Sequence, residues 1–160
     1  MNRKLLAVSV VLALGGGIAT EAFAQANPNQ LIAQRKGAMN LQGKYFGPVL
    51  GMSLGRAPYD PKIVQRNVEY LTVVTQLAWD DFQPHTAGNP NTRAKEDVYK
   101  DPAKFKAGSD KLQEEVQKLA AVVRGGGDQN AVKSAAQAVG RACNSCHESF
   151  TTWDFRFRVE

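Results

Sequence analysis

The sequence predicts an all-α fold, an antiparallel four-helix bundle with up-down-up-down order. Apolar side chains recur at three- and four-residue steps in four separate segments, and each segment is bounded by Gly or Pro. Alternation of apolar and polar residues, which is typical of β-strands, is confined to the short C-terminal stretch 155–159. Four amphipathic helices with short first and last connections pack most simply as a bundle.

The first helix is expected from about residue 29 to residue 50. One face of it carries Leu31, Arg35, Met39, Gln42, Phe46 and Val49. The residues expected to end it are Gly51, Gly55 and Pro58. The second helix begins at Asp60-Pro61, where Asp caps the free N–H groups and Pro suits the first helical position. It is expected to end near Trp79–Phe82, with an inner face of Val64, Val68, Leu71, Val74 and Ala78.

A long connection rich in Pro, Gly, Asn and Thr follows, from Gln83 to about Asp101, and within it Val98 and Tyr99 are expected to fold back on the core. The third helix starts at Asp101-Pro102 with the same capping pattern. Its inner face is Phe105, Leu112, Val116, Leu119 and Val123.

Three glycines, Gly125–Gly127, close the third helix, and Asp128 can cap the fourth. The fourth helix carries Val132, Ala135, Val139, Ala142, Cys143, Cys146 and Phe150 on one face. The alternating stretch after it, 155–159, is too short to form a sheet. It is therefore either an extension packed on the helices or a frayed end.

Residues 1–24 are predicted to be a secretory signal peptide. Two cations, Arg3 and Lys4, precede an apolar run and an Ala-x-Ala cleavage site that ends at Ala24. The alternative is an uncleaved anchor, but the apolar run is short and three glycines interrupt it. Cleavage leaves residues 25–160 as one exported, periplasmic domain, with no later segment apolar enough for membrane insertion.

The formal net charge is +5, and the Lys and Arg residues are spread along the chain. A spread of this kind is typical of solvated helix faces, so binding of nucleic acid is not expected. Positive charge near a functional site would still favour partner proteins with acidic surfaces.

The most specific motif of the chain is Cys143-Asn144-Ser145-Cys146-His147, the C-x-x-C-H pattern of covalent haem attachment. On a helix the two thiols lie on one face, so both can add to the vinyl groups along one porphyrin edge. The His147 imidazole follows on the same face, where a ring nitrogen can bind iron. Export agrees with this interpretation, because bacterial attachment of haem to cysteine takes place outside the cytoplasm.

Two other uses of the motif must be weighed. A Cys-x-x-Cys pair can be a thiol-disulfide redox centre, and a Cys/Cys/His set can be part of a zinc site. The redox centre normally opens a helix after a strand, and no strand is predicted upstream. Zinc requires a fourth ligand, and the second histidine of the chain, His85, lies in a Pro- and Gly-rich stretch without ligand spacing.

With these residues in view, the chain resembles the cytochrome c prime (c′) family of class II c-type cytochromes. The attachment motif near the C-terminus is typical of that class. The other matching pieces are Arg35-Lys36-Gly37-Ala38-Met39, Gly55-Arg56-Ala57-Pro58-Tyr59-Asp60, Ala78-Trp79, Thr92-Arg93-Ala94-Lys95 and Asp101-Pro102-Ala103-Lys104-Phe105. The resemblance implies one haem c, with Cys143 and Cys146 as thioether anchors and His147 as the proximal iron ligand.

The same resemblance implies roles for four residues outside the motif. Arg35 corresponds to an arginine that pairs with a haem propionate, which would also explain a guanidinium on a core face. An exposed arginine is the alternative. Lys36, Thr92 and Arg93 correspond to positions at the propionate edge.

Met39 decides which chemistry is expected. It lies one turn after Arg35, and the resemblance places it over the distal side of the iron. If Met39 packs there without bonding, the iron is five-coordinate, and the protein transfers single electrons or binds NO or CO without catalytic turnover. If its sulfur is the sixth ligand, the haem is a low-spin His/Met electron carrier with a raised reduction potential. Met52, in the loop after the first helix, is a weaker candidate for the same role.

Two features depart from the family pattern. Thr151 stands where relatives usually have Arg or Lys, and the nearest arginine is Arg156. The C-terminal stretch is unusually aromatic, with Trp153, Phe155 and Phe157 available to shield a haem edge, contact a partner or pack on the body.

The resemblance also implies protein partners. Redox proteins are expected as electron donors or acceptors, and a homodimer is expected through the first two helices. Tyr45, Val49 and Leu50 are expected to be exposed and to supply the dimer surface.

Overall fold

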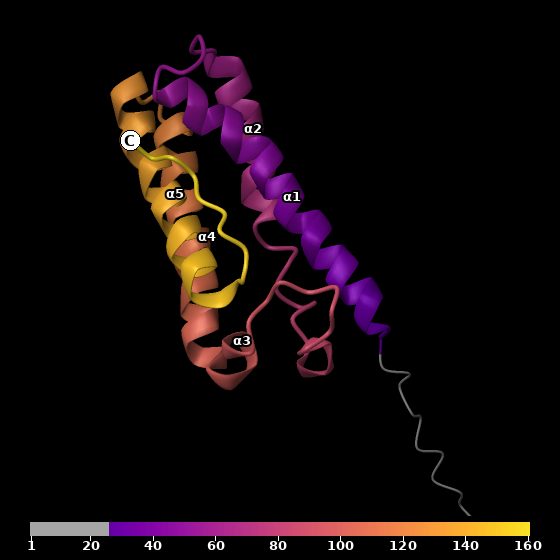
Figure 1. Ribbon diagram of the computed structural model, residues 1–160. Coiled ribbons are helices and arrows are strands. Elements are labelled where there is room, and N and C mark those ends of the chain that lie inside the picture. Colours follow the sequence, from indigo (N-terminus) through magenta and orange to yellow (C-terminus); the bar gives the residue numbers. More distant parts are fainter. Residues whose placement is uncertain (1–25) are drawn as a thin grey trace, which may run out of the picture.

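The computed structural model describes residues 26–160, and its elements in this range are helices (Figure 1). Four long helices, α1 Pro28–Ser53, α2 Pro61–Val74, α4 Pro102–Arg124 and α5 Gln129–Phe150, are joined by connections that hold the short η1 Pro84–Thr86 and α3 Asp97–Lys100. Helix α1 packs on α2 and α5, and α4 packs on the same two helices. The predicted four-helix bundle is confirmed. The predicted signal peptide, residues 1–24, lies outside the described residues.

All four long helices begin with a capped N-terminus. The side chain of each capping residue accepts a hydrogen bond from a backbone N–H of the first turn, at 2.8–3.0 Å, and these residues are Asn27, Asp60, Asp101 and Asp128. In three cases proline is the next residue, where its missing N–H removes no helical hydrogen bond. The starts predicted at Asp60, Asp101 and Asp128 are confirmed.

Two helix ends differ from the prediction. Helix α1 continues through Gly51 to Ser53, and the chain turns at Gly55, whose φ of +75° favours glycine. Helix α2 ends at Val74, before the predicted Trp79–Phe82. The Trp79 indole N–H donates to the Thr75 carbonyl at 2.6 Å and competes with the helical N–H for that oxygen.

The apolar core lies between all four long helices. It contains two residues that were expected at the dimer surface, so that prediction is wrong. Val49 and Leu50 are buried, with 0% and 3% of their surface exposed, because they follow Phe46 by three and four residues and share its inward face. They therefore supply no dimer surface. Tyr45 is half-buried and packs on Tyr70 with ring centroids 5.0 Å apart.

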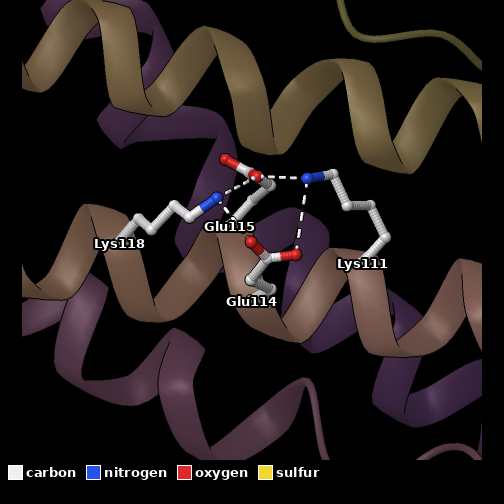
Figure 2. A network of polar contacts seen from close by, with 4 residues as sticks. All are labelled: Lys111, Glu114, Glu115 and Lys118. Carbon is white, nitrogen blue, oxygen red and sulfur yellow. Dashed lines mark hydrogen bonds and ion pairs between the residues drawn. The ribbon is translucent and has the colours of Figure 1, made fainter.

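Helix α4 carries a network of charges on its own surface (Figure 2). The carboxylate of Glu115, 10% exposed, accepts from Lys111 at 2.7 Å and from Lys118 at 2.9 Å. Glu114 pairs with the same two lysines. Hydrogen bonds from Lys111 and Lys118 hold the pKa of the Glu115 carboxyl below its ordinary value. This nearly buried charge is thus neutralised within one helix.

The C-terminal tail, residues 152–160, is a packed extension and not a frayed end. It leaves α5 and runs back along that helix toward its start, drawn in yellow in Figure 1. Beside the junction, Ala94 and Thr151 form an isolated β-bridge between the long connection and the end of α5. The long connection folds back as predicted, with Val98 buried.

Candidate functional site

A cavity of about 420 Å³ opens between α1, the long connection and the end of α5. A smaller cavity of about 130 Å³ continues from it into the bundle. Four residues line both: Met39, Asn40, His147 and Trp153. The fold therefore brings the motif on α5 to the same space as the methionine on α1, about a hundred residues away in the sequence.

The two thiols lie on α5 and form no disulfide. Cys143 lines the inner cavity and Cys146 the outer one. A methyl group at Gly108 of α4 would make ordinary contact with the Cys146 sulfur, at 3.5 Å, so the two helices pack closely beside this thiol. Burial raises the pKa of Cys143 to about 12 and that of Cys146 to about 11. A thiol-disulfide redox centre needs the opposite shift, because the thiolate is its nucleophile.

The His147 imidazole faces this space without a polar partner. Its Nδ1 is buried and has no hydrogen-bond partner among the described residues. Burial lowers the pKa of His147, which favours the neutral imidazole that binds metals. The ring of Phe155, from the C-terminal tail, packs beside it with centroids 5.3 Å apart. A half-buried neutral imidazole whose buried nitrogen has no partner can give a ring lone pair to a ligand of the cavity.

Arg35 forms the opposite wall and is 3% exposed, so the alternative of a surface arginine is wrong. Its guanidinium donates to the Thr86 hydroxyl at 3.0 Å and to the Tyr99 hydroxyl at 3.1 Å. It also donates to the Thr92 hydroxyl and to the Asp81 carbonyl, and it lies 4.5 Å from the Phe82 ring centroid.

All of the hydrogen-bond acceptors of Arg35 are neutral groups. Among the described residues no carboxylate forms an ion pair with it. Burial raises the pKa of the Asp81 carboxyl by more than nearby Arg35 lowers it, and this carboxyl forms no ion pair with the guanidinium. A buried cation without an ion-pair partner is costly, and the position of Arg35 on the cavity wall fits an anionic group of a bound molecule. Thr86 and Phe82 were not predicted from the sequence, because nothing local to them indicates a distant arginine.

The remaining predicted residues gather at the mouth of the cavity. Thr92 accepts from Arg35, while Lys36 donates to the Asn91 carbonyl at 3.4 Å. The Arg93 side chain lines the outer cavity, and its carbonyl accepts from the Thr152 N–H at 2.8 Å. Thr151 also lines the outer cavity, so no cation stands at that position.

The structure separates the two candidate methionines. Met39 is half-buried and lines both cavities with His147. Met52 lies near the start of α5, where its carbonyl accepts from Gln129 at 3.3 Å, and this is the opposite end of that helix from His147. Met39 is thus the methionine that shares the site.

A model of the family described as Cytochrome C′ matches residues 30–151. The chain belongs to the cytochrome c′ family. Cytochrome c′ of Rubrivivax gelatinosus is 36% identical over 123 residues, which cover 77% of this chain and 95% of that protein. Cytochrome c′ of Alcaligenes xylosoxydans xylosoxydans is 31% identical, over 78% of this chain and 95% of that protein.

Solved structures of cytochrome c′ share the fold. The crystal structure from Rubrivivax gelatinosus gives a TM-score of 0.74 at 35% identity, covering 79% of this chain and 98% of that one. A nitric oxide complex of a cytochrome c prime variant from Alcaligenes xylosoxidans gives 0.74 at 30% identity, covering 81% and 99%. No helix in the described range 26–160 is long and apolar enough to cross a membrane.

Haem c, attached covalently through cysteines, is the cofactor of cytochromes c′, and this chain has two cysteines. The residues around the cavity fit that group. Two disulfide-free thiols lie one helical turn apart. Among residues 26–160, the buried Nδ1 of His147 has no hydrogen-bond partner and the buried guanidinium of Arg35 forms no ion pair with a carboxylate. Membership of the family therefore supports the haem interpretation of the motif over the dithiol and zinc alternatives.

Proposed function

We propose that this cytochrome c′ is a periplasmic monohaem protein that transfers single electrons and binds NO or CO at a five-coordinate iron. The observation that carries the proposal is the shared cavity, in which His147 of α5 lies with the apolar side chain of Met39 of α1. The half-buried Met39 side chain leaves room in the cavity for a diatomic ligand. It offers no hydrogen-bond donor that could hold a larger ligand. The protein acts without catalytic turnover.

The residues of α5 have distinct roles in this proposal. Cys143 and Cys146 would hold the haem through thioethers, and the neutral imidazole of His147 would supply a ligand to its iron. The haem supplies a reversible one-electron couple and an iron that accepts diatomic ligands. The raised pKa values of the two thiols do not contradict this role, because a cysteine sulfur in a thioether carries no titratable proton.

On the cavity wall opposite α5, positively charged side chains would bind the propionates of the haem. Arg35 pairs with a propionate, and the hydroxyls of Thr86, Thr92 and Tyr99 hold its guanidinium in place. Lys36 and Arg93 add positive charge at the cavity mouth, where a propionate meets solvent. The same positive edge favours redox partners with acidic surfaces.

A second candidate function is a six-coordinate, low-spin electron carrier in which the Met39 sulfur binds the iron. The observation in its favour is that Met39 lines both cavities together with His147. A thioether ligand would close the site to gases and raise the reduction potential.

Absorption and electron paramagnetic resonance spectra of the ferric protein near neutral pH distinguish the two functions. A five-coordinate iron gives a high-spin signal, which Met39→Leu leaves high-spin because Leu keeps the pocket filled. A low-spin signal that becomes high-spin in Met39→Leu would establish ligation by Met39 and refute the open site. Met52→Leu is the matched control and should change neither spectrum.

Export and assembly are parts of the same proposal. N-terminal sequencing of the periplasmic protein should begin at Gln25, and a start at Met1 would refute the signal peptide. The dimer surface is formed by exposed apolar side chains of α1, of α2 and of the turn after α2, which are Leu41, Tyr70, Val73 and Leu77. Sedimentation at micromolar concentration should show a dimer that Val73→Asp dissociates, and a monomeric parent protein would contradict it.

A further inference from the structure

The C-terminal tail lies outside the part of the chain that the family model matches, which ends at residue 151. From residue 154 to residue 160 its side chains alternate in exposure, after three exposed residues at 152–154. Phe155, Phe157 and Val159 are half-buried, whereas the charged residues between and around them are exposed. The tail is therefore an extended segment with one apolar side, and that side faces the bundle.

Polar side chains of the bundle hold the backbone of the tail. The Phe157 N–H donates to the Asn144 amide oxygen at 2.7 Å, and the Asn144 amide nitrogen donates to the Phe157 carbonyl at 2.9 Å. Gln137 donates to the Val159 carbonyl at 2.7 Å. Arg56, in the turn after α1, donates to two more carbonyls of the tail, those of Arg158 at 3.0 Å and Glu160 at 2.8 Å.

Helix α5 is also shaped to receive the tail. Gly140 lies in the middle of this helix, where glycine is less favourable than alanine unless packing requires it. A methyl group at position 140 would lie 2.5 Å from Val159 Cγ1, closer than carbon atoms can approach. It would make only ordinary contact with the Phe46 ring, at 3.7 Å. The glycine therefore leaves space for the last apolar residue of the tail.

A series of aromatic contacts connects this anchor to the site. The Phe157 ring lies edge-on to Phe46 with centroids 4.8 Å apart, and Phe155 lies edge-on to Phe157 at the same separation. Phe155 in turn packs beside the His147 ring at 5.3 Å. Trp153 follows beside Phe155 at 5.0 Å and lines both cavities. The tail thus forms one apolar side of the space around His147.

We propose that the tail is a strap in which Phe155 positions the His147 ring and keeps water away from it. This inference rests on the proposed role of His147 as the iron ligand. An apolar, water-poor surrounding disfavours the oxidised iron, which carries one more positive charge, and so raises the reduction potential. Phe155 acts through His147 and is a positioning residue.

The midpoint potential of the haem-loaded protein, measured by spectroelectrochemical titration, tests the role of Phe155. Phe155→Ala should lower the potential, and Phe155→Leu should restore most of the difference because it refills the apolar space. Arg158→Ala is the matched control, since its side chain is exposed and only its backbone carbonyl is bonded. Equal potentials in the parent protein and Phe155→Ala would overturn the positioning role.

A double-mutant cycle tests whether the tail is seated on α5. In the parent protein Gly140→Ala should lower the melting temperature, because the new methyl group displaces Val159. In a Val159→Ala background the Cγ1 atom that would clash is absent. Gly140→Ala should then raise the melting temperature, because alanine favours the helix more than glycine does. The same shift in both backgrounds would refute the seated strap. If the parent protein attaches no haem, the proposed function is refuted. The melting temperatures of the double-mutant cycle would still show whether the tail is seated on α5.

Discussion

Two nearly buried charges of this cytochrome c′, Glu115 on α4 and Arg35 on α1, differ in their partners. Glu115 accepts from two lysines of its own helix (Figure 2). Arg35 is more deeply buried, and its hydrogen bonds go to hydroxyls, a carbonyl and no carboxylate of the described residues. The Glu115 charge is therefore balanced within the chain. The Arg35 guanidinium instead lies on the wall of a cavity that is also lined by His147, whose Nδ1 has no hydrogen-bond partner among the described residues. A buried charge on a cavity wall without an ion-pair partner in the chain therefore indicates that the bound molecule carries the opposite charge.

The largest effect is expected for Arg35→Met. Removing the guanidinium leaves the hydroxyls of Thr86 and Tyr99 and the haem propionate without their donor, which should cost about 3 kcal/mol of unfolding free energy. The midpoint potential should also fall, because a positive charge near the iron is lost. Chemical denaturation and spectroelectrochemical titration measure the two effects.

Lys36→Met is the control for Arg35→Met, since it removes the neighbouring, exposed cation that lines the same cavity. It should leave the stability nearly unchanged. A loss of stability in Arg35→Met with no change in potential would mean that Arg35 pairs with no part of the haem, and the comparison with Glu115 would then fail.

A smaller effect is expected for Tyr99→Phe. The Tyr99 hydroxyl is within hydrogen-bond distance of Arg35 at 3.1 Å and of Thr86 at 2.7 Å, so its removal should cost about 1 kcal/mol. The potential should change little, because the guanidinium keeps its other acceptors. Denaturation curves of the haem-loaded protein measure the cost, and a variant as unstable as Arg35→Met would show that the hydroxyls and not the propionate are the main partners. Tyr70→Phe, on the outer surface of α2, is the matched control.

The smallest effect is expected for Glu115→Gln, at about 0.5 kcal/mol, because both lysine partners are largely exposed. The folded protein lowers the pKa of this carboxyl below 4.5, so the stabilisation is fully present above that value. It disappears as the pH falls through the lower folded pKa. Stability measured against pH should show a smaller loss in acid for Glu115→Gln than for the parent protein, because Glu114 keeps its own lysine partners. Equal acid profiles would remove Glu115 from the comparison.

Local features of the sequence were enough to predict much of this structure. The Asp and Asp-Pro caps fixed the starts of α2, α4 and α5, and the helical period placed Arg35 and Met39 on the inward face of α1. The attachment motif is local as well, so its position on α5 followed from the same period. Such signals depend on neighbouring residues alone.

Apart from the burial of Leu50, the features that the sequence did not predict depend on distant contacts. Thr86 and Tyr99 reach Arg35 across 51 and 64 residues of sequence, and no local pattern indicates that meeting. Leu50 follows the buried Phe46 by one turn, but it was assigned to a surface from the expected dimer. The seat of the tail depends on Gly140, whose role is evident only when Val159 is placed against it.

The central claim is that Cys143 and Cys146 hold a haem c whose iron is bound by His147. A pyridine haemochrome spectrum of the exported protein, recorded after extraction with acidified acetone, tests it most directly. We expect one haem per chain to remain with the protein and to give the spectrum of a haem with both vinyl groups converted to thioethers. Haem that passes entirely into the organic phase, or a protein without haem, would contradict the account.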